Sequence, residues 1–196
     1  MVQLVMSVQG KGIKDLERAT RVLGSKKSHR GFSMAINRTG RKGFTQVKRA
    51  VSKQAGLTQK KTIRYGNINQ QFANPGKLAH KIISTGGEVP LKAFKARETR
   101  KGVKASPFGK RQLFDGTFIK SGWWPNRRGA VGNGHVFTPD TSTNRAGRPF
   151  SRTPSGVRIP QQIVIDESKA AFERNAASLP KNINHIITRM TKGVIS

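Results

Sequence analysis

A helical periodicity with charge on one side runs from Ser25 to Ala55, and it constrains the fold more than any other feature. Apolar residues recur in this segment at steps of three, four or eight, at Phe32, Ile36, Phe44, Val47 and Val51. At about 100° per residue they cover an arc of roughly 120°, and lysines and arginines occupy most of the remainder. The pattern predicts a long basic amphipathic helix that packs its apolar face on a core.

Three glycines interrupt this pattern, at Gly31, Gly40 and Gly43. Glycine inside a helix costs roughly 1 kcal/mol of helix propensity relative to alanine. We therefore expect a kink or break near Gly40–Gly43. Gly56 is placed to end the helix.

The positive charge is concentrated on this helix and the residues after it. The chain of 196 residues has 38 Lys+Arg against 9 Asp+Glu, a formal net charge of +29, and no acid occurs from Arg18 to Gly87. Solvated helix faces usually mix both signs, so a face of one sign favours contact with a polyanion. The polyanion is a nucleic acid or an acidic protein surface. The candidate contacts are Arg30, Arg38, Arg41, Lys42, Lys48, Arg49, Lys53, Lys60, Lys61 and Arg64.

Shorter patterns predict the other elements. Alternation indicates a strand at Val2–Gln9, and helical spacing indicates a helix at Ile13–Leu23 and another turn at Thr58–Tyr65. Strands are expected at Leu78–Ser84 and Val89–Ala96, joined by a Gly86-Gly87 turn, and at Gln112–Lys120. Asn74-Pro75-Gly76 signals a turn.

The last third of the chain predicts a loop, a strand and a helix. Residues 122–155 are rich in Gly, Pro, Asn, Ser and Thr, which is typical of a long binding or assembly loop, with a strand around Val131–Phe137. Val157–Ile165 alternates and contains Pro160, so it predicts an edge strand. Asp166 is a good N-cap for a final helix that Pro180 should kink or split.

These elements predict one α+β domain over residues 1–196. It would contain N-terminal helices, a mainly antiparallel sheet with the long loop 122–155, and a C-terminal helix. A chain of this length is typical of a single domain.

Residues suited to catalysis or metal binding are sparse. The chain lacks cysteine, its four histidines show no metal-ligand spacing, and it has neither a GxSxG motif nor a Walker loop. We therefore expect no enzyme, catalytic residue, cofactor or metal. No apolar run reaches the ~20 residues of a membrane span, so no membrane partner is expected.

Four short motifs, in this order and rough spacing, resemble the minor tail protein Z family of lambdoid phages and prophages. They are residues 12–17 (GIKDLE), 33–38 (SMAINR), 156–160 (GVRIP) and 179–182 (LPKN). The resemblance extends from about residue 10 to 193. The Val2–Gln9 strand and the 122–155 loop have no counterpart in it.

The resemblance implies a structural virion protein that completes the head-proximal end of the tail at the neck. It implies a ring, expected to be hexameric, that helps head–tail joining and positions the genome end. Its partners would be further copies of itself, the tail terminator and connector proteins, and the genome DNA end. The chain would be found in the virion tail, and in the host cytoplasm during assembly. Candidate interface residues are Trp123, Trp124, Phe150, Val157, Ile159 and Ile163.

A nucleic-acid-binding module, such as a ribosomal-type RNA-binding protein, is the alternative from another class. Its basic helix and long basic loop would thread through RNA. Residues 159–196 are nearly balanced in charge and contain an apolar helix, which favours the tail protein.

Overall fold

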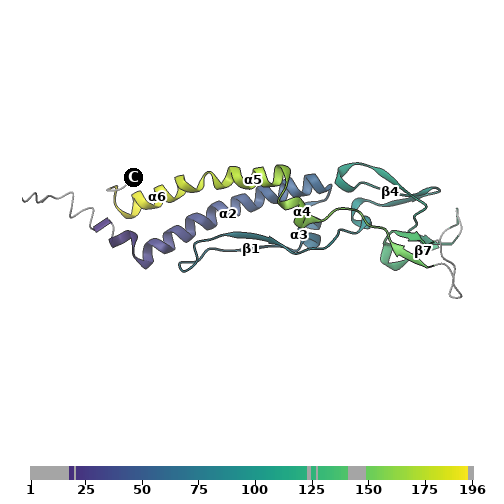
Figure 1. The fold of residues 1–196 in the computed structure, drawn as a ribbon, viewed down its shortest axis with the longest axis horizontal. Helices are drawn as coiled ribbons and strands as arrows, with labels where there is room; N and C mark the ends of the chain where they lie inside the picture. The colour runs from purple at the N-terminus through teal and green to yellow at the C-terminus, as the bar shows by residue number, and fades with distance from the viewer. Residues whose placement is uncertain (1–17, 20, 123–124, 127, 141–148, 194–196) are drawn as a thin grey trace, which may run out of the picture. The chain divides into compact units, whose positions relative to one another are not determined.

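The structure is a computed structural model that describes residues 18–19, 21–122, 125–126, 128–140 and 149–193. The helices are α2 (Lys26–Ala55), α3 (Gln59–Gly66), α4 (Ile159–Ile163), α5 (Asp166–Ala176) and α6 (Leu179–Met190) (Figure 1). The 3₁₀ turns are η1 (Leu91–Phe94), η2 (Pro107–Gly109) and η3 (Gly132–Gly134). This composition confirms the α+β class.

Among the described residues, four small sheets replace the predicted larger one. The strands are β1 (Ile68–Gln71), β2 (Lys81–Ser84), β3 (Arg97–Thr99), β4 (Gly102–Ala105), β5 (Gln112–Asp115), β6 (Lys120–Ser121), β7 (Arg128–Ala130), β8 (Phe137–Pro139) and β9 (Phe150–Arg152). They pair as β1-β2, as β3-β4-β5, as β6-β7 and as β8-β9, and the last three sheets are antiparallel.

Helix α2 is continuous from Lys26 to Ala55, so the predicted break near Gly40–Gly43 is wrong, and a kink there stays a prediction. Two of its glycines are sites of close packing. A Cβ at Gly40 would lie 2.4 Å from Cγ of His80, and one at Gly31 would lie 2.9 Å from Cγ2 of Ile186. The neighbours that approach these glycines offset their low helix propensity.

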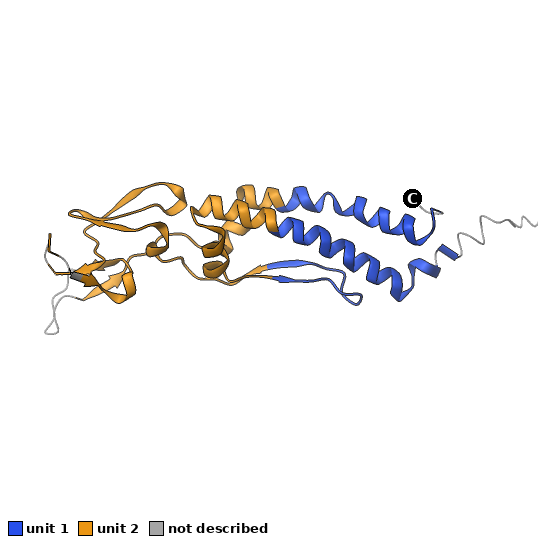
Figure 2. Cartoon of the chain, turned by 180° about the vertical axis from the view of Figure 1, so that it is seen from behind, with its two compact units in different colours: residues 1–44, 70–82, 172–196 blue, residues 45–69, 83–171 orange. Residues whose placement is uncertain are grey.

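Two compact units make up the chain (Figure 2). Unit 1 comprises residues 1–44, 70–82 and 172–196, and unit 2 comprises residues 45–69 and 83–171. Both α2 and α5 contribute residues to each unit, so the division does not by itself define two domains. The single domain stays a prediction.

In unit 1, the first part of α2 lies between α6 and the segment 70–82 (Figures 1 and 2). Asn182 of α6 donates from Nδ2 to Oγ1 of Thr39 at 2.8 Å. On the other side, the Asn37 side chain hydrogen bonds to the backbone of Ala73. The turn signalled by Asn74 is confirmed, because its backbone exchanges hydrogen bonds with Lys77.

In unit 2, the end of α2 packs into an apolar core. Its fully buried side chains include Val47, Val51, Val89, Leu91, Phe94, Val103, Val157 and Ile159. Ser52 of α2 donates to Oγ1 of Thr62 in α3 at 2.9 Å, which pairs two buried hydroxyls. Thr58 caps α3 through its side chain, so the predicted helical turn is confirmed.

Two predicted strands are short helices, and in each a proline opens the turn. Val89–Ala96 contains η1, with Pro90 at its N-cap, and Val157–Ile165 contains α4, with Pro160 in its first turn. Proline lacks an amide proton and fixes φ near −65°, which suits a helix start. The predicted Gly86-Gly87 hairpin is also absent, because β2 pairs with β1 and Gly86 donates to the Gly66 carbonyl at 2.9 Å.

Of the remaining predicted elements, one is confirmed, one differs in the structure and two lie largely outside the described residues. The split at Pro180 is confirmed, because α5 ends at Ala176 and α6 begins at Leu179. Parts of 122–155 form β7, β8 and β9, so this segment is not a plain loop. The strand Val2–Gln9 lies outside the described residues, as does most of Ile13–Leu23, although residues 18–19 and 21–23 are helical.

Candidate functional site

The predicted basic face of α2 is exposed in unit 1. Arg30, Arg38, Arg41 and Lys42 are exposed, whereas Ala35 and Thr39 of the same helix are buried. The first turn of α2 has no acid. The amphipathic pattern therefore places these cations on a surface where an anion can reach them.

Arg41 differs from its neighbours because it packs on an aromatic ring. Its Cζ lies 5.1 Å from the centroid of Phe72, and Phe72 meets His80 edge to face at 5.5 Å between centroids. Cation–π contacts of this kind stabilise a fold by roughly 0.5–1 kcal/mol at exposed sites. Arg41 thus has a structural contact in addition to any role in binding.

Unit 2 holds the other predicted contacts, and one of them is structural. Arg49, Lys53, Lys60 and Arg64 are exposed, and Lys48 is half-buried. Lys61, by contrast, donates from Nζ to the carbonyl of Ala93 at 2.7 Å and so fixes α3 to η1. This bond joins residues 32 apart, and periodicity does not predict it.

A recess at the start of α2 adds cations that the candidate set omitted. Lys26, Lys27, His29 and Arg30 line it together with the turn at Pro75 and Gly76, around a volume of about 780 Å³. The adjacent lysines Lys26 and Lys27 could have been added to the candidate contacts from the sequence. Only the fold shows that the turn at Pro75 and Gly76 lies beside them.

The predicted interface residues differ in their burial. Val157 and Ile159 are fully buried in unit 2, so they are core residues and their assignment to an exposed edge strand is wrong. Ile163 is half-buried in α4. Trp123 and Trp124 lie outside the described residues.

Phe150 is half-exposed and belongs to an aromatic cluster that the sequence did not reveal. Its ring centroid lies 5.0 Å from that of Phe137 and 5.7 Å from that of Phe118. The bridge between Phe118 and Phe137 and the pairing of β8 with β9 bring these three rings together.

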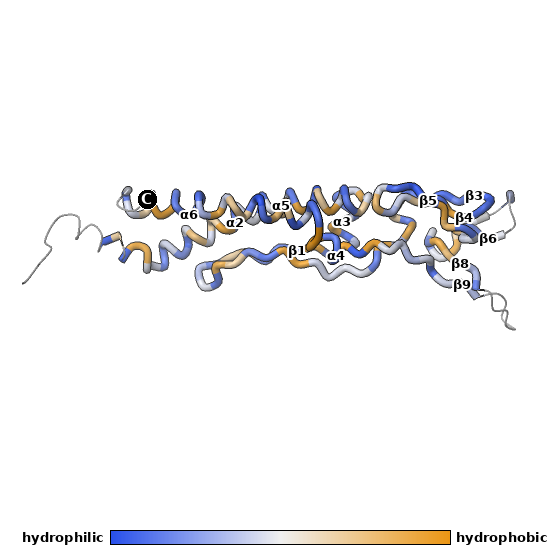
Figure 3. Tube along the Cα trace, turned by 45° about the horizontal axis from the view of Figure 1, so that its top comes forward, coloured by the Kyte–Doolittle hydropathy of each residue, from blue (hydrophilic) through white to orange (hydrophobic). Residues whose placement is uncertain are grey.

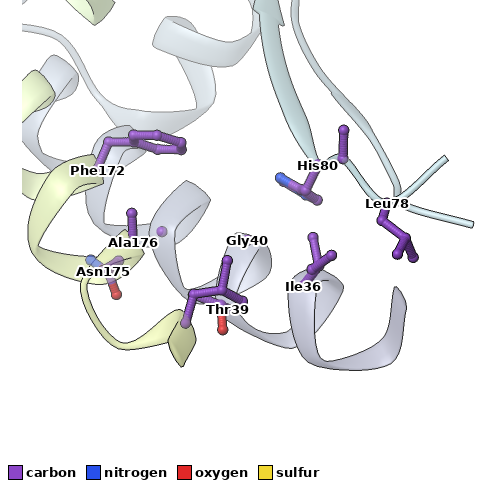
Figure 4. Close-up of a pocket in the computed structure, with 11 residues that line it drawn as sticks. Ile36, Thr39, Gly40, Leu78, His80, Phe172, Asn175 and Ala176 are labelled. Carbon is purple, nitrogen blue, oxygen red and sulfur yellow. The ribbon is translucent and has the colours of Figure 1, made fainter. Parts of the chain in front are cut away.

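A pocket of about 230 Å³ in unit 1 is mostly apolar (Figure 4). It is bounded by Ile36 and Gly40 of α2, by Leu78 and His80, and by Phe172. Both ring nitrogens of His80 are buried, and no described residue hydrogen bonds to them. Burial, and secondarily the charge of Arg41, lowers the pKa of His80 below its ordinary value of 6.5.

His80 is therefore neutral at pH 7, and no carboxylate or nucleophilic thiol lines this pocket. Among the described residues, no three His, Cys, Asp or Glu side chains are grouped so that they could hold a metal ion. In the same ranges, no helix is long and apolar enough to cross a membrane. The basic surfaces are thus the better candidates for a functional site.

Comparison of the chain with protein-family models, with curated proteins and with solved structures finds no match.

Proposed function

We propose that this chain is a structural protein of a tailed bacteriophage that completes the head-proximal end of the tail at the neck. It acts as a ring, joins head to tail and helps to position the genome end. Its partners are further copies of itself, the neighbouring terminator and connector proteins, and the genome end. The ordered resemblance of four motifs to the minor tail protein Z family carries the proposal.

The positions of three motifs support a resemblance at the level of the fold. Asn37, from the second motif, bonds to Ala73, and Asn182, from the fourth, bonds to Thr39. Val157 and Ile159, from the third, are core residues of unit 2. Motif residues that join elements in this way are expected to be shared by proteins of one fold.

The exposed cations support contact with an anionic partner in the neck. Arg38, Lys42, Arg49 and Lys53 are exposed, and none of their side chains has a hydrogen bond or ion pair with another described residue. Unpaired cations repel one another and are stabilised when an anion neutralises them.

The test is to locate the chain and determine its assembly state. We expect purified particles from the source to contain the protein at the neck, by immunogold labelling, and the isolated protein to form a closed ring by native mass spectrometry. The variant Arg38→Gln/Lys42→Gln/Arg49→Gln/Lys53→Gln should fold normally and be incorporated less. A strictly monomeric protein, absent from particles and bound to cellular RNA, would instead support the ribosomal-type alternative.

A further inference from the structure

The sheet β3-β4-β5 of unit 2 places two cations directly opposite each other. In its antiparallel register Arg97 pairs with Lys104, and Lys104 pairs in turn with Leu113. Paired residues share one face of a sheet, with Cβ atoms about 5 Å apart. Both cations are exposed, and within the described ranges the side chain of neither forms a hydrogen bond or an ion pair. Like charges in this position destabilise a sheet.

The nearby acids do not relieve this repulsion. Glu98 follows Arg97 but lies on the opposite face, where it pairs with buried Val103 and accepts a hydrogen bond from the amide of Lys120 at 3.1 Å. Asp115 shares the face of Lys104 but pairs with Gly102, so it stands diagonal to Lys104 and not directly opposite it. Neither acid therefore stands across the strand from either cation.

Further exposed cations lie in the segments that flank these strands, at both ends of the sheet. Arg100 and Lys101 form the turn between β3 and β4, and Lys110 and Arg111 directly precede β5. Figure 3 shows the corresponding hydrophilic colouring along β3. We call Arg97, Arg100, Lys101, Lys104, Lys110 and Arg111 the sheet patch.

We propose that the sheet patch binds the phosphate backbone of a nucleic acid. Lysine and acidic residues are depleted in the centres of protein interfaces, whereas interfaces with nucleic acid are rich in positive charge. The patch combines six cations with one apolar neighbour on the sheet, Leu113. Binding of phosphates neutralises Arg97 and Lys104 together, so the repulsion present in the free sheet is released in the complex.

Among the described strands β3, β4 and β5, this face carries no aromatic side chain on which bases could stack. The aromatic residue of β5, Phe114, pairs with Val103 and so lies on the other face. Stacking on aromatic rings is the usual means of holding unpaired bases, and side chains that reach base edges supply sequence selectivity. The sheet patch should therefore bind the phosphate backbone of a duplex more tightly than unpaired bases, which need an aromatic ring to stack on. This proposal does not depend on the proposed function of the chain in the phage tail.

The variant Arg97→Gln/Lys104→Gln tests the proposal with two readouts of opposite sign. Removal of the repulsion should raise the melting temperature, while removal of two phosphate contacts should weaken binding to a 30-base-pair duplex. Each lost contact reduces the slope of log K against log salt by about 0.9, so we expect a total reduction of about 1.8 between 50 and 200 mM salt. Lys104→Glu should also raise the melting temperature, because the new carboxylate would pair with Arg97, and should weaken binding further.

The matched control is Arg189→Gln/Lys192→Gln, which removes two exposed cations from unit 1 and leaves the sheet patch intact. A loss of binding no greater than in this control would overturn the proposal. So would a lower melting temperature in Arg97→Gln/Lys104→Gln, because it would show that the cations stabilise the sheet. Equal competition by polyglutamate and duplex DNA would assign the patch to an acidic protein instead. These results concern a purified protein, so they are independent of whether it occurs in particles.

Discussion

Asn37 of α2 satisfies both backbone groups of Ala73, a residue 36 positions further along the chain. Its Oδ1 accepts a hydrogen bond from the Ala73 amide at 2.8 Å, and its Nδ2 donates to the Ala73 carbonyl at 2.8 Å. Ala73 is buried, so both of its peptide groups would lack partners without Asn37. The Asn37 side chain thus fixes the backbone of the segment 70–82 to the helix in unit 1.

Replacement of Asn37 by alanine should therefore lower the free energy of unfolding by about 2–5 kcal/mol, because two buried backbone groups lose their partners. Urea denaturation measures this change. Asn184→Ala, at an exposed position of α6, is the control and should change stability by less than about 0.5 kcal/mol. Equal effects of the two variants would contradict the role of Asn37.

Two glycines of α2 should respond to alanine in opposite directions. At Gly40 the new Cβ would meet the His80 ring at 2.4 Å, so Gly40→Ala should destabilise the protein by about 1–3 kcal/mol. At Gly43 the nearest atom, Cβ of Asn175, lies 3.6 Å away, which leaves room. Gly43→Ala should then stabilise by about 0.5–1 kcal/mol through helix propensity. Thermal unfolding of both variants checks this, and stabilisation by both would show that His80 does not limit the space.

The buried imidazole of His80 should make stability depend on pH. Its folded pKa is lowered, so below about pH 6.5 the unfolded chain binds a proton that the folded chain resists. The free energy of unfolding should consequently fall as the pH drops below that value. His80→Phe removes the titrating group and its two unpartnered nitrogens. Denaturation curves between pH 4.5 and 8 should show a smaller pH effect for this variant, and identical profiles would refute the prediction.

The helical assignment of α4 can be tested by truncation of one apolar residue inside it and one just after it. Ile159 is fully buried and lies against Gly66, so Ile159→Ala should cost about 2–5 kcal/mol. Ile165 is 40% exposed, so Ile165→Ala should cost much less. A strand would bury both residues, because they have the same parity. Comparable losses in chemical denaturation would therefore favour the strand.

Two neighbouring lysines of α3 should differ in their effect on stability, because only Lys61 makes a structural hydrogen bond. Lys61→Gln removes the bond to the Ala93 carbonyl and should destabilise the protein by about 1–2 kcal/mol. Lys60→Gln changes an exposed cation and should leave stability within about 0.5 kcal/mol. Calorimetric melting of the two variants checks this difference. If both variants lowered the melting temperature equally, the bond from Lys61 to Ala93 would not be a specific source of stability.

The sequence by itself determined the features that depend on neighbouring residues. The helical period of α2, its one-sided charge, the helical turn after Thr58 and the break at Pro180 all follow from the spacing and conformational preferences of adjacent side chains. Such preferences act within a few residues, so they can be predicted without knowledge of the fold.

Only the tertiary structure decided which distant groups meet. It placed His80 on Gly40, which permits an unbroken helix despite its glycines, and it buried Ile159 in a short helix instead of an edge strand. It also set the register that puts Arg97 opposite Lys104. Residues far apart in the chain are brought together by burial of apolar surface and pairing of backbone groups. These energies belong to the whole core, so no local pattern specifies them.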